Sequence, residues 1–136
     1  MTVTLKIIYA EQTIDLRHKV LWPDHPRDSV MIAEDHQATH FGAFDQDTLL
    51  GVGSFFSDGP SVRLRKLAVD PHAQGRGIAS QLIATACAHF SSLGKERLWC
   101  DARLSAKDFY VKNGFDVSDT VFVKKNLDYV SAERLL

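Results

Sequence analysis

A short segment with two glycines and an arginine, Gln74-Gly75-Arg76-Gly77, lies between an apolar run and an apolar helical repeat. Glycine has no Cβ, so Gly75 and Gly77 allow backbone N–H groups to close around an anion. The first amides of a helix lack partners within the helix, and the helix dipole places partial positive charge beside them. Arg76 adds a guanidinium, a group that binds phosphate well. The segment therefore predicts a cradle for a pyrophosphate group.

The residues next to these glycines exclude two common nucleotide-binding motifs. A P-loop requires Gly-Lys-Ser/Thr to reach terminal phosphates and magnesium, whereas Gly77 is followed by Ile78. The dinucleotide-binding fingerprint requires three spaced glycines and an acidic residue about 20 positions later. Only two glycines are present, and no acidic residue near Arg97 ends a second strand at that distance. A glycine-rich turn that only caps a helix remains an alternative for Gly75-Arg76-Gly77 taken alone.

Strand and helix patterns on both sides of this segment must position it. Apolar residues from Ile78 to Leu93 recur at helical spacing, and Gly94 is well placed to end that helix. The order of strand and helix patterns predicts one mixed α/β domain over residues 1–136. The predicted strands are Thr2–Tyr9, Phe41–Phe44, Leu49–Phe56, Val62–Val69, Arg97–Cys100, Phe115–Val117 and Val121–Val123, and the predicted helices are Glu11–Leu21, Gly77–Leu93 and Ser105–Asn113.

The composition is that of an ordinary globular protein. Apolar residues make up 45% of the 136 residues and charged residues 24%, and the formal net charge is −1. This balance gives no general reason to expect binding to nucleic acid or to an anionic membrane. No apolar run approaches the roughly 20 residues of a membrane-spanning helix, and Met1–Ala10 lacks the pattern of a signal peptide. We therefore expect a cytoplasmic protein in which Cys87 and Cys100 are reduced and buried.

Two blocks of the sequence resemble the GNAT superfamily of N-acetyltransferases. The family signature Gln/Arg-x-x-Gly-x-Gly/Ala is matched by Gln74, Gly77 and Ala79, after the similar run Leu-Ala-Val-Asp-Pro. The segment from Ala106 to Phe115 is similar to the family's Ala-x-x-Phe-Tyr-x-x-x-Gly-Phe. Both blocks occur in the expected order and at a typical separation. The resemblance covers roughly residues 62–117, and together the two blocks disfavour a turn that only caps a helix.

The resemblance implies a GNAT-like acyl-CoA N-acyltransferase fold, with a central mixed, mostly antiparallel twisted sheet flanked by helices. It implies acetyl-CoA as co-substrate and direct transfer of the acetyl group to an amine. The compact single domain favours a primary amine of a small molecule, and no metal is expected. Leu67 and Val69 would offer main-chain groups to the pantetheine arm and the thioester, and a strand N–H of Ala68 or Val69 would stabilise the oxyanion. The residues expected to hold the pyrophosphate are Gln74, Gly75, Arg76, Gly77, Ile78, Ala79 and Ser80.

Two further residues are assigned through the second block. Tyr110 would give a proton to the departing thiolate, the alternative being a half-buried aromatic residue beside Phe109. Arg103 stands where the family often has an asparagine that contacts the pantetheine arm. This departure puts that contact in doubt, and Arg103 would reach a phosphate instead or lie in solvent.

The general base is harder to assign. Attack by an amine requires a neutral nitrogen, whereas a free ammonium with a pKa of about 10 is protonated at neutral pH. Many relatives carry a glutamate on the strand before the loop, but Val62–Leu67 contains no carboxylate. The candidates elsewhere are His40, Asp101 and Asp35. We select His40 because histidine changes charge near neutral pH, against the alternative of a histidine at a strand end.

Charged residues near this strand suggest the nature of the acceptor. Arg63 and Arg65 share a face with Leu67 and Val69, because side chains alternate along a strand. If that face looks into the acceptor cleft, we expect an acceptor with a carboxylate or another anionic group; the alternative is a solvated outer face. Lys124-Lys125 is interpreted as ordinary surface charge. His36, His40 and Asp35 are not expected to form a metal site, because the chain after His40 is a predicted strand and no third ligand stands nearby.

The functions that remain open differ in the kind of acceptor and in whether the protein catalyses a reaction at all. The chain is expected to act on a small molecule, and the alternatives are a protein or peptide N-acetyltransferase and a non-catalytic acyl-CoA-binding module. The absence of a carboxylate on the strand before the loop keeps the last alternative open. Val121–Val123 and the tail Leu127–Leu136 are candidates for a homodimer interface or for completing the sheet.

Overall fold

The strands pair into one seven-stranded sheet in the computed structural model, which describes residues 2–136. The strand order is β1-β2-β3-β4-β5-β7-β6, and every neighbouring pair is antiparallel except β4 and β5, which are parallel. The sheet is therefore mixed and mostly antiparallel, as predicted. The strands are β1 (Thr4–Ile8), β2 (Thr39–Asp45), β3 (Thr48–Asp58), β4 (Ser61–Val69), β5 (Arg97–Arg103), β6 (Asp116–Lys124) and β7 (Leu127–Leu135).

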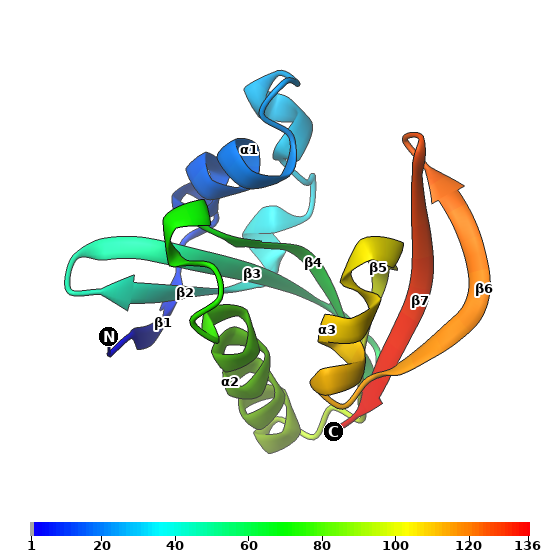
Figure 1. Ribbon diagram of the computed structural model, residues 1–136. Coiled ribbons are helices and arrows are strands. Elements are labelled where there is room, and N and C mark those ends of the chain that lie inside the picture. The colour runs from blue at the N-terminus through cyan, green and yellow to red at the C-terminus, as the bar shows by residue number, and fades with distance from the viewer. Residues whose placement is uncertain (1) are drawn as a thin grey trace.

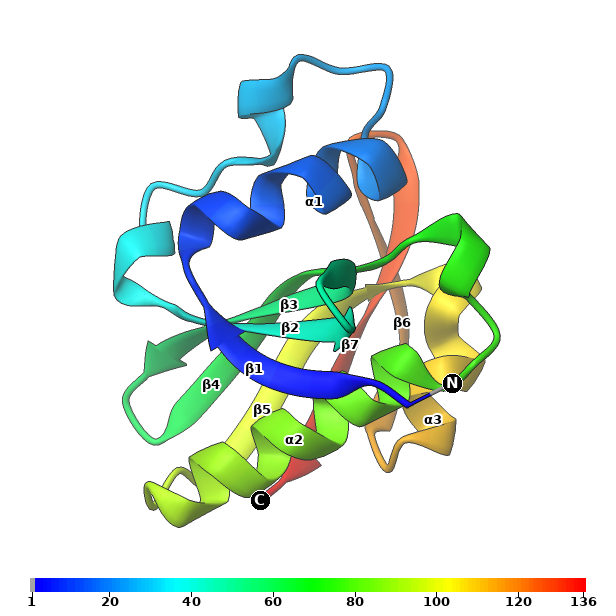
Figure 2. The same cartoon turned by 90° about the vertical axis from the view of Figure 1, so that its left-hand side faces the viewer.

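Helices cover both faces of this sheet, with α1 on one side and α2 on the other (Figure 2). Leu82 and Phe90 of α2 pack in the main core together with Tyr110 of α3. Leu16 of α1 packs with Ala68 in a smaller cluster on the opposite face. The α-helices are α1 (Ile14–Leu21), α2 (Ile78–Ser92) and α3 (Lys107–Lys112), and the 3-10 turns are η1 (Ala10–Thr13), η2 (Arg27–Val30), η3 (Asp35–Gln37), η4 (Pro71–Ala73) and η5 (Leu104–Ala106). No helix in residues 2–136 is long and apolar enough to cross a membrane.

The C-terminal part of the chain differs from its predicted elements. The two short strands predicted at Phe115–Val117 and Val121–Val123 are parts of one strand, β6, whose register shifts between Val117 and Val121. The tail from Leu127 forms β7, which lies between β5 and β6 and thus completes the sheet. In Figure 1, β6 and β7 stand apart from the hairpin strands β2 and β3, at the other end of the sheet.

A β-bulge interrupts the regular alternation of β4. Ser54 of β3 pairs with Arg65 and Val52 pairs with Ala68, so Gly53 alone lies opposite both Lys66 and Leu67. Lys66 has a φ of +60°, in the left-handed region that residues other than glycine rarely adopt. The bulge therefore inserts one extra residue at Lys66.

This extra residue changes which side chains share a face. Leu64 before the bulge and Val69 after it both lie in the core beneath α2, whereas Ala68 lies in the cluster beneath α1. Arg63 and Arg65 alternate with Leu64, so they face the α1 side. The prediction that both arginines share a face with Leu67 and Val69 is therefore wrong, because a shift of one position moves side chains to the opposite face.

β4 and β5 separate after a short paired stretch. Ser61–Arg63 pairs with Arg97–Trp99, and no later residue of β4 pairs with β5 in the described chain. β5 remains paired with β7 on its other side, from Arg97 to Arg103. The edge of β4 at residues 64–69 thus faces β5 without a strand partner, and its backbone groups on that edge are available to another molecule.

A buried polar cluster joins α1 to the segment before β2. Arg17 is 0% exposed and donates hydrogen bonds to both carboxylate oxygens of Asp35 at 2.8 Å, to the Ser54 hydroxyl at 2.8 Å and to the Val30 carbonyl at 3.0 Å. Burial by itself raises the pKa of the Asp35 carboxyl, but the bonds from Arg17 and from the Ile32 N–H hold it below its usual value. Asp35 is therefore ionised and anchors the segment between α1 and β2.

Replacing Asp35 tests this anchor. Asp35→Ala leaves the buried Arg17 charge without its partner, so we expect a loss of about 3–5 kcal/mol in the free energy of unfolding. Urea denaturation followed by circular dichroism measures the loss. Arg17→Met combined with Asp35→Ala should recover part of it, because no unpaired charge then remains. Asp15→Ala, which removes the partner of Arg27 at an exposed pair, is the control and should leave stability nearly unchanged. A small loss for Asp35→Ala would contradict the proposed role of the anchor.

Candidate functional site

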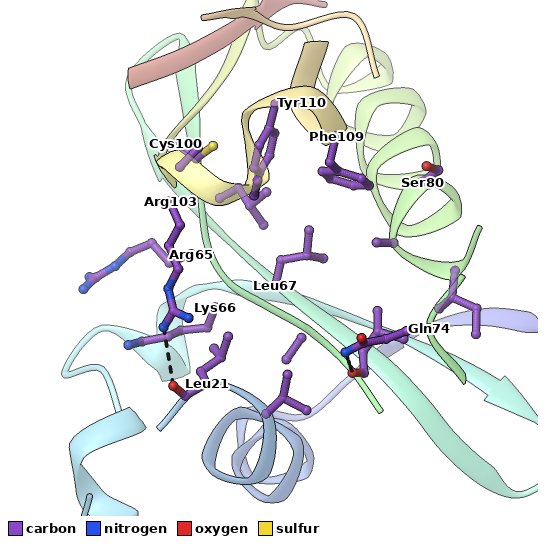
Figure 3. Close-up of a pocket in the computed structure, with 18 of the residues that line it drawn as sticks. Leu21, Arg65, Lys66, Leu67, Gln74, Ser80, Cys100, Arg103, Phe109 and Tyr110 are labelled. Atoms are coloured by element: carbon purple, nitrogen blue, oxygen red, sulfur yellow. Dashed lines mark hydrogen bonds between the residues drawn. The ribbon is translucent and has the colours of Figure 1, made fainter. Parts of the chain in front are cut away.

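A cleft of about 680 Å³ opens where β4 and β5 separate. Residues from Arg63 to Val69 line one wall, and residues from Cys100 to Arg103 line the other. Figure 3 shows Gln74 and Ser80 at one end of the cleft and Leu21, Lys66 and Arg103 at the other end. The cleft therefore joins the glycine-containing loop to the C-terminal end of α1.

The loop at the first end has the backbone conformation that its glycines permit. Gly75 and Gly77 have φ values of +79° and +76°, and Gly77 is the N-cap of α2. A Cβ on either glycine would meet no other atom within 4 Å, so the space beside the loop is open. The amides of Ile78, Ala79 and Ser80 begin α2, and the first amides of a helix are free to bind an anion.

Two side chains that precede the glycines brace this loop. The Gln74 amide donates to the Val69 carbonyl at 3.0 Å. The Asp70 carboxylate accepts from the His72 backbone N–H and from the Lys19 ammonium, each at 2.9 Å. These bonds tie the loop to the end of β4 and to α1, so the amides of the loop are held in place before any ligand binds.

Tyr110 lies on the wall of the cleft near its middle. Its ring packs edge-on against Phe109 and Phe115, with centroids 5.1 and 5.2 Å away, and the residue is 8% exposed. The Tyr110 hydroxyl donates a hydrogen bond to the Cys100 sulfur. Burial and the neighbouring Cys100 raise the pKa of Tyr110 well above its usual value. Tyr110 is therefore protonated at neutral pH, and its hydroxyl is a weaker acid than that of a free tyrosine.

Comparison with known proteins identifies the fold and family. The profile of the acetyltransferase (GNAT) domain matches residues 8–136. The chain belongs to the GNAT family of acetyltransferases. YitI of Bacillus subtilis (strain 168), described as an uncharacterized N-acetyltransferase, is 29% identical over 120 residues, which cover 82% of this chain and 80% of YitI. The predicted family is confirmed, and the protein is an acyltransferase.

Solved GNAT structures share the whole architecture. A Lactobacillus plantarum protein assigned as an N-acetyltransferase aligns with a TM-score of 0.89 at 16% identity, over 100% of this chain and 99% of its own. PaiA N-acetyltransferase from Thermoplasma acidophilum, solved in complex with coenzyme A, aligns with a TM-score of 0.75 at 18% identity over 100% of both chains. These similarities confirm the predicted GNAT fold.

Most of the predicted site residues of this GNAT domain line the cleft. Those that do are Leu67, Ala68, Val69, Gln74, Gly75, Gly77, Ile78, Ala79, Ser80, Arg103 and Tyr110. Arg76 is exposed and is not among the lining residues. The loop of this acetyltransferase therefore presents its glycine and helix amides to the cleft, and the Arg76 side chain lies outside it.

The structure does not bring His40 into the cleft. His40 is 2% exposed, and its Nε2 lies 2.8 Å from the Asp35 carbonyl, which can only accept, so Nε2 carries a proton. Its Nδ1 lies 2.7 Å from the Ser54 hydroxyl. Both ring nitrogens are thus engaged in the cluster around Arg17, and the geometry gives no support to His40 as the general base. Asp35, another candidate for the general base, belongs to the same buried cluster.

The remaining carboxylate candidate lies in the cleft but is paired. Asp101 accepts hydrogen bonds from Arg63 and from Lys124, both at 3.1 Å. Lys124 is exposed, as predicted, and it also lines the cleft. The strand that precedes the loop places Lys66 in the cleft as well, a residue to which the sequence interpretation gave no role. A signal for it existed, because the consecutive polar residues Arg65-Lys66 break the alternation of β4.

A matched pair of glycine substitutions tests the anion cradle. Gly77→Ala forces a side chain into a left-handed conformation at the N-cap of α2, so the loop amides shift and CoA affinity falls by about tenfold or more. Gly59→Ala is the control, because Gly59 also has a positive φ, of +57°, and open space around it but lies outside the cleft. Calorimetric titration with CoA measures the affinity. Equal affinities for both variants would contradict the cradle.

Proposed function

We propose that the protein transfers the acetyl group of acetyl-CoA directly to a primary amine of a small molecule. The observation that carries this proposal is one cleft with the glycine-containing loop and the start of α2 at one end, Tyr110 near the middle, and a space lined by Lys66 and Arg103 beyond it. The CoA complex of PaiA, which has the same fold, supports acetyl-CoA as the co-substrate.

The chain offers a distinct surface to each part of acetyl-CoA. The amides from Gly75 to Ser80 would hold the pyrophosphate at the start of α2. The pantetheine arm would lie along the edge of β4 at residues 64–69, whose backbone groups face β5 without a strand partner. The thioester would then lie beside Tyr110, which lines the same cleft.

The transfer itself requires one bond to form and one to break. The neutral amine attacks the thioester carbonyl carbon, a C–N bond forms, and the strand N–H of Val69 stabilises the oxyanion, because it points away from β3 while the neighbouring Asp70 N–H bonds to Leu50 of β3. The C–S bond then breaks, and Tyr110 donates its proton to the departing thiolate. The amine nitrogen loses one proton, so the products are the acetamide and CoA with a free thiol. Tyr110 regains its proton from that released by the amine, through water.

No dedicated base is assigned to the amine. Asp101 is the one carboxylate among the described residues that line the cleft, and it is paired with Arg63 and Lys124. We propose that water in the cleft accepts the amine proton. The reaction rate should therefore follow the fraction of acceptor that is already neutral in solution.

The far end of the cleft favours a small acceptor over a polypeptide. Arg103 donates to the Leu21 carbonyl at 3.4 Å, which joins β5 to the end of α1. The Lys125 ammonium, in the turn between β6 and β7, lies 5.2 Å from the centre of the Trp22 ring. These contacts bring three elements together across the far end, so an extended peptide would have to displace them.

A thiol-release assay tests the proposed reaction. Acetyl-CoA and a panel of primary amines should give CoA with a free thiol together with the acetylated amine, in equal amounts. Mass spectrometry identifies the product, and omission of the amine is the control for hydrolysis. Tight binding of CoA without release of thiol from any amine would instead support an acyl-CoA-binding module.

Removing one hydroxyl tests the role of Tyr110. Tyr110→Phe keeps the ring packed against Phe109 and Phe115 but removes the proton donor, so kcat should fall by about 100-fold while the KM for acetyl-CoA changes little. Tyr9→Phe removes a hydroxyl from an exposed residue and should leave kcat unchanged. An unchanged kcat in Tyr110→Phe would show that the thiolate obtains its proton elsewhere.

A further inference from the structure

The side chains that line the cleft are strongly unbalanced in charge. The cations are Arg63, Arg65, Lys66, Arg103, Lys112 and Lys124, and Asp101 is the one acidic residue among the described lining residues. The whole chain, by contrast, has a net charge of −1. Positive charge is therefore concentrated in the cleft, where a negatively charged ligand would be attracted.

Besides Lys112 on α3, three of these cations form no ion pair among the described residues. Arg63 and Lys124 share Asp101, whereas Arg65, Lys66 and Arg103 form no ion pair within residues 2–136. Glu34 and Asp35 act on Arg65 only from beyond ion-pair distance. We call these three residues, Arg65, Lys66 and Arg103, the cation cluster.

Two members of the cation cluster, Arg65 and Arg103, are held by aromatic rings and a carbonyl. The Arg103 guanidinium lies 5.0 Å from the centre of the Trp22 ring and donates to the Leu21 carbonyl. The Arg65 guanidinium lies 5.8 Å from the centre of the Phe56 ring. These contacts orient the positive groups but leave their charge uncompensated. An anion that binds between them would meet donors already in place.

Lys66 is surrounded by other positively charged residues. The bulge in β4 places it among like charges, and burial, followed by repulsion from Lys125, Arg65, Arg17 and Arg103, lowers the pKa of Lys66 to about 8. A bound anion would favour the charged form of Lys66. Without a ligand, the neighbouring positive charges repel one another. A bound anion would reduce this repulsion.

The charges of CoA do not reach the cation cluster in the proposed orientation. In CoA, the pyrophosphate and the phosphorylated ribose both lie on one side of the pantetheine arm, away from the thiol. The loop for the pyrophosphate is at the Gln74 and Ser80 end of the cleft, whereas Lys66 and Arg103 lie at the opposite end (Figure 3). The side chain of Tyr110 lines the cleft between the two ends. The cation cluster therefore faces the space left for the acceptor.

We propose that the cation cluster binds an anionic group of the acceptor, so that the substrate is a small amine that also carries a carboxylate or a phosphate. This inference rests on the proposed acetyl transfer and adds the class of acceptor to it. Arg65 and Arg103 offer planar pairs of N–H donors to the oxyanion, and Lys66 adds a point charge. Binding of the anionic group at this end leaves the amine of the acceptor directed toward the thioester. Diamines and polyamines without an anionic group are disfavoured by the same charges.

Pairs of acceptors that differ only in the anionic group provide the kinetic test. We expect kcat/KM to be about tenfold higher or more for γ-aminobutyrate than for its amide, for phosphoethanolamine than for ethanolamine, or for both pairs. The pair with the larger ratio distinguishes a carboxylate from a phosphate. Lys66→Met and Arg103→Met should each reduce that ratio while the affinity for CoA remains. Lys6→Met, which removes a positive charge on β1 outside the cleft, is the control and should keep the ratio.

A binding measurement separates this inference from the proposed reaction. With CoA present to occupy the loop, the side-chain NMR signal of Lys66 in ¹³C-lysine-labelled protein is titrated against pH with inorganic phosphate or succinate. The Lys66→Met variant assigns the signal. Either anion should raise the midpoint from its value near pH 8, and the rise should be smaller in Arg103→Met. If an anion raises the midpoint of the Lys66 titration but no amine is acetylated, the proposed reaction is refuted and the proposed anion site is supported. Turnover that is equal within both pairs, or a midpoint that neither anion moves, would overturn the anion site.

Discussion

The separation of β4 from β5 is the constraint on which the other features of the site depend. The two strands pair over Ser61–Arg63 and then part, so a backbone edge in the middle of the sheet remains unpaired. An interior sheet edge normally finds a partner strand, because unpaired backbone groups are costly when they are buried. Here the gap is kept open by β7, which holds β5 from its other side, and by β3, which holds β4. A bound extended arm can thus take the place of the absent strand pairing.

The bulge at Lys66 and the buried cluster around Arg17 act on the same wall of this gap. The bulge turns Leu67 and Val69 toward the main core, while Arg65 remains on the side of α1. Arg17 reaches Ser54 in β3 and Asp35 in the segment before β2, so α1 is fastened to the sheet behind the cleft. Arg65 and Lys66, which line the cleft, form no ion pair with the described residues.

The sequence predicted those elements that depend on local patterns of residues. It did not predict those that depend on pairing between strands far apart in the chain. The glycine segment, the apolar repeat of α2 and the position of Tyr110 in the second block led to the correct elements, and Cys87 and Cys100 are indeed free and buried. The pairing of β7 between β5 and β6 depends on contacts far apart in the chain, which no local pattern contains. The burial of His40 follows from its bonds to Ser54 and Asp35 rather than from its own neighbours in sequence.

One end of the cleft is formed mainly by backbone groups, and the other end is formed by side chains. The loop end relies on amides, which almost any residue supplies, provided that glycine occupies the positions with positive φ such as Gly75. The far end relies on the side chains of Arg65, Lys66 and Arg103, each of which one codon change would alter. Over evolutionary time, a descendant of this enzyme would therefore keep its acyl donor while readily exchanging its acceptor, without rebuilding the scaffold that holds both.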